Sequence, residues 1–302
     1  MKETPQKISE KQTQTADTFG YKWAKLDTFE SEASLNRARE WLFERYCGGK
    51  PEIREQWFAD GPKTILDAGC GAAMSAMLLF DGYLADNHFI GVDISDAVFV
   101  AKERFEKEGL PGEFHKSDLL NAPVPDNSVD IIFSEGVLHH TDSVRNAIIS
   151  LSTKLKSGGK FMFYVYAKKS PMREYSDDYI REQLVPMNND EAWDALKPLT
   201  KLGIALGKLD ITIDVPEDIE LLGIKKGPQN LQRLLYWHFC KMYYDPNLTM
   251  EEMNHINFDW FRPLNCIRST PEEIQAYCRE AGLHIDTMDV QEAGITILAT
   301  RE

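Results

Sequence analysis

The 302-residue sequence has no run of about 18 apolar residues, the length that a membrane-spanning helix needs. Its first residues, Met1–Lys7, lack the apolar core of a signal peptide. The five cysteines are scattered, odd in number and without a C-x-x-C pair, which argues against a disulfide framework or a zinc site. These absences predict a cytoplasmic protein with no metal and no membrane association.

Positive charge is also scarce, because 34 Lys and Arg face 48 Asp and Glu, a net charge of −14. A broad nucleic-acid surface needs Lys and Arg to neutralise phosphates, so a nucleic-acid partner is not expected. The length fits one large domain or a core domain with an insertion. Nothing in the sequence indicates the oligomeric state.

The most informative stretch is Thr64–Ala73, in which an apolar run reaches Asp67 and breaks at Gly69-Cys70-Gly71. Glycines allow a sharp strand-to-helix turn and the close approach of a ligand. A carboxylate at Asp67 would sit poorly beside a phosphate and well beside a sulfonium or ammonium group. The alternative is an ordinary turn that binds nothing.

A second acidic strand end follows at Asp93, after the apolar run His88–Val92. A carboxylate at this place in an α/β sheet accepts hydrogen bonds from ribose hydroxyls. The alternative role is to cap the next helix. Ser95 or Asp96 can provide that cap, which would leave Asp93 to the ribose.

The segment Asp67–Gly71 resembles the first motif of class I S-adenosylmethionine-dependent methyltransferases, acidic-x-Gly-x-Gly, with Ala73 in place of a third glycine. The loop Ser117–Leu119, the turn and strand Pro123–Phe133 and the Leu-Lys-Ser-Gly-Gly of 155–159 follow in the family's order. Within that family, the chain is most similar to the bacterial small-metabolite type, with a cap insertion after the fifth strand.

The resemblance implies an α/β fold: a Rossmann-like, seven-stranded, mostly parallel sheet with an antiparallel last strand, plus a mainly helical cap insertion. The helix that should follow the fifth strand is found a hundred residues later, where Thr270 and Glu273 form a capping box. The intervening segment is too long to be a loop. The expected domains are a disordered tail (1–17), an N-terminal helical lid (18–59), the methyltransferase core (60–167 and 270–302) and a substrate cap (168–269).

The resemblance also implies S-adenosylmethionine as the cofactor and assigns residues to it. Four places would each contact one part of the cofactor. They are the glycine turn, the end of the second strand, the loop Ser117–Leu119 and the end of the fourth strand. Tyr21 and Trp23 belong to an N-terminal segment that closes over the cofactor in similar proteins, or else fasten that segment to the core. The assigned residues are Tyr21, Trp23, Asp67, Gly69, Gly71, Asp93, Ile94, Asp118, Leu119, Ser134 and Glu135.

Two histidines, His139 and His140, follow the fourth strand and are the candidate catalytic residues. A neutral imidazole can take a proton from a hydroxyl or amine nucleophile. The alternative is that a histidine here binds loop carbonyl groups.

The candidate substrate contacts lie at the end of the fifth strand and in the insertion, which is rich in large aromatics. Arg173 would either hold a carboxylate or phosphate, or pair with Asp177. The aromatics would either line a site or form a satellite core. The residues assigned to substrate are Tyr166, Arg173, Tyr175, His238 and Trp260.

The sequence thus predicts an enzyme that methylates O, N or C of a small metabolite. The alternatives are a tRNA or protein methyltransferase and a non-catalytic protein that binds the cofactor. The charge of −14 opposes the tRNA alternative.

Overall fold

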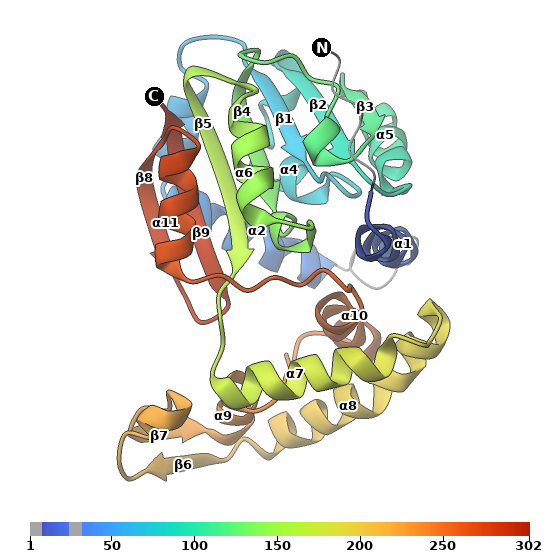
Figure 1. Cartoon of the computed structure of the whole chain (residues 1–302), viewed down its shortest axis with the longest axis vertical. Coiled ribbons are helices and arrows are strands. Elements are labelled where there is room, and N and C mark those ends of the chain that lie inside the picture. Colours follow the sequence, from blue (N-terminus) through green and yellow to red (C-terminus); the bar gives the residue numbers. More distant parts are fainter. Residues whose placement is uncertain (1–7, 24–31) are drawn as a thin grey trace. The chain divides into compact units, whose positions relative to one another are not determined.

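The computed structural model of the chain describes residues 8–23 and 32–302, which form two compact units (Figure 1). The larger unit contains α1 (Glu10–Trp23) and residues 36–167 and 265–302. The smaller unit contains residues 168–264 and, among the described residues, also 32–35. Each unit is described by itself below.

A seven-stranded sheet in the order β3-β2-β1-β4-β5-β9-β8 forms the centre of the larger unit. Neighbouring strands from β3 to β5 are parallel, and β9 is antiparallel to both β5 and β8. This confirms the predicted fold class. The strands are β1 (Thr64–Ala68), β2 (His88–Asp93), β3 (Glu113–Lys116), β4 (Val129–Glu135), β5 (Leu155–Tyr166), β8 (Leu283–Val290) and β9 (Gly294–Arg301).

Helices cover both faces of this sheet, which explains why its central strands are continuous apolar runs. On one face, Ile148 and Ile274 of two helices join the main hydrophobic core. On the other, Tyr46 packs edge-on against Phe133 of β4, with ring centroids 5.5 Å apart. The helices are α2 (Glu32–Cys47), α3 (Pro51–Trp57), α4 (Met74–Leu79), α5 (Ala97–Lys107), α6 (Val144–Ser152) and α11 (Pro271–Glu280), with short 3₁₀ turns at 84–86, 119–121 and 138–140.

Two helix caps are present, and the second was predicted from the sequence. The Ser143 hydroxyl accepts the backbone N–H of Asn146 at the start of α6. Thr270 and Glu273 form the capping box of α11, with Pro271 in its first turn. These local signals were readable because a cap needs only residues close in sequence.

The N-terminal segment differs from its prediction. Residues 10–17, expected within a disordered tail, are the first half of α1, whereas residues 1–7 lie outside the described residues. The segment is polar, yet Gln12, Thr15 and Thr18 are buried. Hydrogen bonds hold it, as described below, and hydrophobicity alone could not reveal them.

The smaller unit is mainly helical, as predicted, with a two-stranded antiparallel sheet. Its longest helix begins at a capping box at Asn188 and continues through Pro198. The elements are α7 (Pro171–Leu184), α8 (Asn189–Leu209), β6 (Thr212–Val215), η5 (Glu220–Leu222), β7 (Gly227–Asn230), α9 (Leu231–His238) and α10 (Met250–Phe261).

None of the described helices combines the length and apolar character that a membrane span requires. All five cysteines are free thiols, and only Cys240 is not buried.

Candidate cofactor and methyl-transfer site

The Gly-x-Gly turn after β1 depends on glycine at both positions. Gly69 has φ +85°, and a Cβ there would lie 2.2 Å from Cγ1 of Val137. Gly71 has φ +50°, and a Cβ there would lie 2.9 Å from Nε1 of Trp23. Any side chain at either position would clash. Ala73, in place of the family's third glycine, also adopts a left-handed conformation, with φ +59°.

Trp23, at the end of α1, therefore lies against the turn that is expected to hold the cofactor. Lys22 is buried beside it, with its ammonium nitrogen 4.4 Å from the centre of the Trp23 ring. Tyr21 is half-buried on the same helix. The cofactor roles of Trp23 and Tyr21 remain predictions. The position of Trp23 beside the glycine turn is compatible with such a role.

Three carboxylates point from one face of the sheet at the carboxyl ends of adjacent strands. Asp67 is paired in register with Gly91 and with Phe133. Asp93 and Glu135 lie two residues beyond those partners, and side chains two apart share a face. The ligand crevice of an α/β sheet lies at this edge.

Asp67 shows the electrostatic effect of placing three carboxylates close together. It is 3% exposed, and burial, followed by the charges of Asp93 and Glu135, raises its pKa well above the usual range. Within the described residues, no hydrogen bond reaches its carboxylate. A like-charge group of this kind is stabilised by a cationic ligand and would repel a phosphate.

The Asp93 carboxylate accepts more hydrogen bonds from the protein than predicted. Its carboxylate accepts hydrogen bonds from the backbone N–H of Gly71 at 2.8 Å and from the N–H and hydroxyl of Ser95 at 2.8 and 2.7 Å. The expectation that Ser95 would leave Asp93 unengaged is wrong. Three of about four lone-pair positions are used, so Asp93 shapes the turn and keeps little capacity for a ribose.

Glu135, at the end of β4, is bound by two residues of α2. Arg45 forms an ion pair with Oε1, and the Tyr46 hydroxyl donates to Oε2 at 2.5 Å. Burial and the Glu135 charge raise the pKa of Tyr46 well above its usual value. Sequence reasoning missed Arg45, because α2 and β4 are 90 residues apart and no motif links them.

Asp118 and its neighbours occupy the expected loop. The Asp118 carboxylate caps a short turn through the N–H of Leu120 at 3.4 Å, and burial raises its pKa. The Leu119 side chain lies in the core, so only its backbone can face a ligand. Ile94 is half-buried directly after Asp93.

Ser134 lies at the expected strand end. It is completely buried, and its hydroxyl donates to the carbonyl oxygen of Ala68 on β1 at 2.7 Å. This bond ties β4 to β1. The assignment of Ser134 to the cofactor stays a prediction, and its hydroxyl is engaged within the sheet.

The two histidines lie in a buried aromatic cluster. His139 is stacked on Tyr166 of β5, with ring centroids 3.6 Å apart, and the His140 ring is 4.3 Å away. The two histidines are 0% and 4% exposed. Phe19 of α1 packs edge-on against His140 at 4.8 Å.

The carbonyl oxygen of Asn265 lies 2.6 Å from Nδ1 of His140, so the alternative of a histidine bound to a loop carbonyl holds for this nitrogen. Asn265 is itself held by α1. Its N–H donates to the Thr15 hydroxyl, and its amide donates to Gln12 and Asp142. The helix α1 thus fixes the loop that orients His140.

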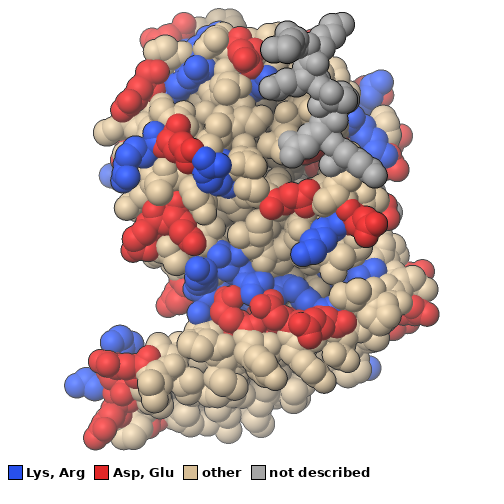
Figure 2. All heavy atoms as spheres, viewed as in Figure 1, with Lys and Arg blue, Asp and Glu red and all other residues tan. Residues whose placement is uncertain are grey.

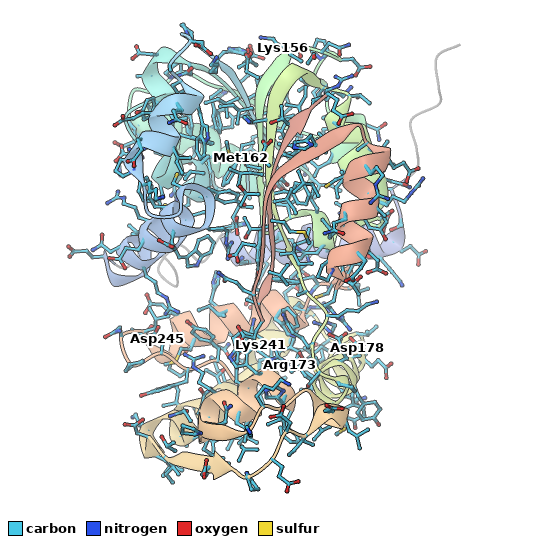
Figure 3. All side chains as sticks on the ribbon, turned by 90° about the vertical axis from the view of Figure 1, so that its left-hand side faces the viewer. Lys156, Met162, Arg173, Asp178, Lys241 and Asp245 are labelled. Atoms are coloured by element: carbon cyan, nitrogen blue, oxygen red, sulfur yellow. The ribbon has the colours of Figure 1, made fainter. Side chains whose placement is uncertain are left out.

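In the smaller unit, Arg173 pairs with Asp177, which is the second of the two alternatives given above. Arg173 is 1% exposed, pairs with Asp177 at 2.5 Å and donates to the Tyr236 carbonyl oxygen. Figure 3 shows where Arg173 lies in the smaller unit. Trp260 is 3% exposed and donates its indole N–H to the Asp177 carboxylate at 2.7 Å. Both side chains have partners in this buried centre, which favours the structural alternative, and their role as substrate contacts stays a prediction.

Two other predicted substrate residues show no binding arrangement. Tyr175 is 71% exposed on α7. His238, at the end of α9, has its Nδ1 3.2 Å from the carbonyl oxygen of Leu222. Neither was distinguishable from a binding residue in the sequence, because exposure and carbonyl partners depend on the tertiary fold.

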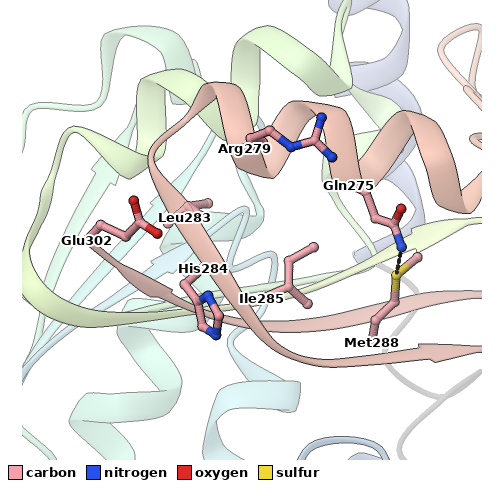
Figure 4. A pocket seen from close by; sticks show the side chains of 7 residues that line it. All are labelled: Gln275, Arg279, Leu283, His284, Ile285, Met288 and Glu302. Atoms are coloured by element: carbon pink, nitrogen blue, oxygen red, sulfur yellow. Dashed lines mark hydrogen bonds between the residues drawn. The ribbon is translucent and has the colours of Figure 1, made fainter.

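An open pocket of about 470 Å³ lies between α11 and β8 (Figure 4). Leu283 begins β8 and Glu302 follows β9, which places this part of the pocket at the amino end of the parallel strands. The acidic group lies at the opposite end of the sheet, so this pocket is separate from the candidate cofactor site.

On the visible face of the larger unit, basic and acidic side chains are interspersed (Figure 2). Neither kind forms a broad patch there. This distribution agrees with the low content of Lys and Arg.

Comparison with known proteins agrees with this geometry. Residues 66–163 match the model of a methyltransferase domain family. The chain is 28% identical to phosphoethanolamine N-methyltransferase 1 of Arabidopsis thaliana over 43% of this chain and 27% of that protein. It is 27% identical to sterol 24-C-methyltransferase of Pneumocystis carinii over 63% of this chain and 48% of that protein. The chain thus spans between about a quarter and a half of these relatives.

Among solved structures, magnesium protoporphyrin IX methyltransferase from Synechocystis PCC 6803, with bound SAH, has a TM-score of 0.51 and 13% identity. The match covers 97% of this chain and 100% of that one, and it shows the fold.

The matching segment is a methyltransferase domain of the class I, S-adenosylmethionine-dependent type. It contains the glycine turn, the three carboxylates and the fourth strand described above. The match agrees with the predicted class of enzyme and with S-adenosylmethionine as its cofactor.

Proposed function

We propose that this protein transfers a methyl group from S-adenosylmethionine to an oxygen, nitrogen or carbon atom of a small metabolite. The observation that carries the proposal is the group formed by Asp67, Asp93 and Glu135, in which Asp67 has no hydrogen bond from the described residues. The cofactor supplies a methyl group on a positively charged sulfur. A buried anionic group attracts that charge.

The preference for a small acceptor rests on two further observations. The relatives named above are called phosphoethanolamine and sterol methyltransferases, after small molecules. The net charge of −14 opposes RNA. The insertion, predicted as the substrate cap (168–269), would supply the selectivity, and a cytoplasmic location stays a prediction of the sequence.

His140 has the tautomer that a general base needs. A carbonyl oxygen only accepts, so Nδ1 of a neutral His140 carries the proton that it shares with Asn265. The lone pair then resides on Nε2, the nitrogen that can take a proton from an acceptor hydroxyl or amine. Tyr166 is stacked on His139 beside it and remains a candidate substrate contact.

The test is incubation with methyl-labelled S-adenosylmethionine and a mixture of metabolites, followed by mass spectrometry. We expect label in a small molecule. Labelling of tRNA or protein alone, with strongly salt-dependent RNA binding in the first case, would overturn the small-metabolite proposal. Cofactor binding without transfer to any of these acceptors would favour the non-catalytic alternative.

Once the acceptor is known, His140→Ala should lower turnover by about 10²- to 10⁴-fold, the usual loss for a general base. Cofactor affinity measured by calorimetry should stay unchanged. His139→Ala is the matched variant. Full rates in both would mean that neither histidine is the base.

A further inference from the structure

Arg45 of α2 is a half-buried cation with unused hydrogen-bonding capacity beside the acidic group. Its side chain is 13% exposed, and its Nη1 is paired with Glu135. A guanidinium has five N–H donors, and this ion pair is the only hydrogen-bonded contact that the described residues give it. The remaining donors are oriented in the plane of the group.

Two aromatic rings hold the guanidinium in place. Its central carbon lies 4.0 Å from the centre of the Trp41 ring and 3.9 Å from that of Tyr164, a residue paired in register with Glu135. Rings pack against the plane of the guanidinium, so they orient its N–H groups without using them. Burial, the largest single cause, acts to lower the pKa of Arg45, but the charges of Glu135, Tyr46 and Tyr164 and the hydrogen bond to Glu135 together raise that pKa.

Arg45 and Glu135 together complement a zwitterion. Glu135 accepts one bond at each carboxylate oxygen and can accept more, so an ammonium can join it. The guanidinium can hold a carboxylate with two parallel hydrogen bonds. The aminoacyl end of S-adenosylmethionine carries these two groups on one carbon atom.

We propose that Arg45 binds the carboxylate of the aminoacyl end of the cofactor, while Glu135 faces its ammonium. This inference rests on the proposed function, since it concerns the same cofactor. It makes Arg45 the residue that distinguishes the intact cofactor from analogues without a carboxylate. Without it, the acidic group of Asp67, Asp93 and Glu135 would favour the more positively charged analogue.

The experiment compares S-adenosylmethionine with its decarboxylated form, which keeps the sulfonium and the amine, by calorimetry. We expect the wild-type protein to bind the intact cofactor at least about tenfold more tightly. Arg45→Gln should abolish or reverse this preference, and Arg45→Lys should keep part of it, because lysine keeps the charge and loses the fork.

Arg54→Gln is the matched control. Arg54 also comes from an N-terminal helix, and it donates to the Leu79 carbonyl oxygen at 3.2 Å. This variant should keep the wild-type preference, and circular dichroism of every variant checks folding. An unchanged preference in folded Arg45→Gln overturns the inference, as does an equal loss of affinity for both ligands. Failure of the wild-type protein to bind either ligand would instead reject the proposed function.

Discussion

The two units bury charge in opposite ways. In the larger unit, the carboxylates of Asp67, Asp93 and Glu135 lie close together, and although Arg45 pairs with Glu135, Asp67 has no hydrogen bond from the described residues. In the smaller unit, Asp177 is shared by Arg173 and the Trp260 indole. A buried pair of opposite charges with its hydrogen bonds made stabilises the fold, whereas like charges raise the free energy until a ligand of opposite charge binds.

The strongest test of this contrast is Asp177→Ala. The change leaves Arg173 buried without its carboxylate and removes the partner of the Lys241 backbone N–H. We expect a loss of about 3–5 kcal/mol in the free energy of unfolding, measured by chemical denaturation. Asp178→Ala is the control, because Asp178 is half exposed in its pair with Arg181 and should cost less than about 1 kcal/mol. Equal losses would contradict the structural role of Asp177.

Asp67→Asn should give the opposite result. Removing a like charge leaves the stability unchanged or higher, while affinity for S-adenosylmethionine falls by about 10- to 100-fold, the usual contribution of a hydrogen bond to a charged group. Thermal denaturation and calorimetry measure the two effects. A large loss of stability with unchanged affinity would mean that Asp67 is structural.

The same carboxyl predicts a pH dependence. The folded-state pKa of Asp67 lies above its unfolded value, so its contribution to stability is complete below the unfolded pKa and is lost as the pH rises through the folded pKa. Cofactor binding should strengthen over that rise and release a proton, since the sulfonium favours the ionised form. Calorimetry in buffers of different ionisation enthalpy measures the proton. Asp67→Asn should release none.

Ser134→Ala has the smallest expected effect. It removes the bond to the Ala68 carbonyl oxygen and should cost about 1 kcal/mol of stability. Cofactor affinity should change less than twofold, because the hydroxyl is directed between strands. A tenfold loss of affinity in a stably folded variant would mean that the hydroxyl itself contacts the cofactor.

Much of the fold was predictable because its signals are local. Asp67-x-Gly-x-Gly determines a turn, Thr270 and Glu273 determine a helix start, and apolar runs determine buried strands. The helix α1 was missed because Gln12 and Thr15 are buried by hydrogen bonds to the distant Asn265. The pattern of apolar residues does not reveal such hydrogen-bond partners.

The same distinction between local signals and distant partners applies to the candidate site. The glycine turn and the acidic ends of β1, β2 and β4 could be recognised in the sequence alone, since each depends on neighbouring residues. Only the tertiary structure decided that Arg45 joins Glu135, that Ser134 bonds to Ala68 and that Arg173 turns to Asp177. The physical reason is that a polar side chain binds the nearest complementary partner in space, and folding selects that partner from far along the chain.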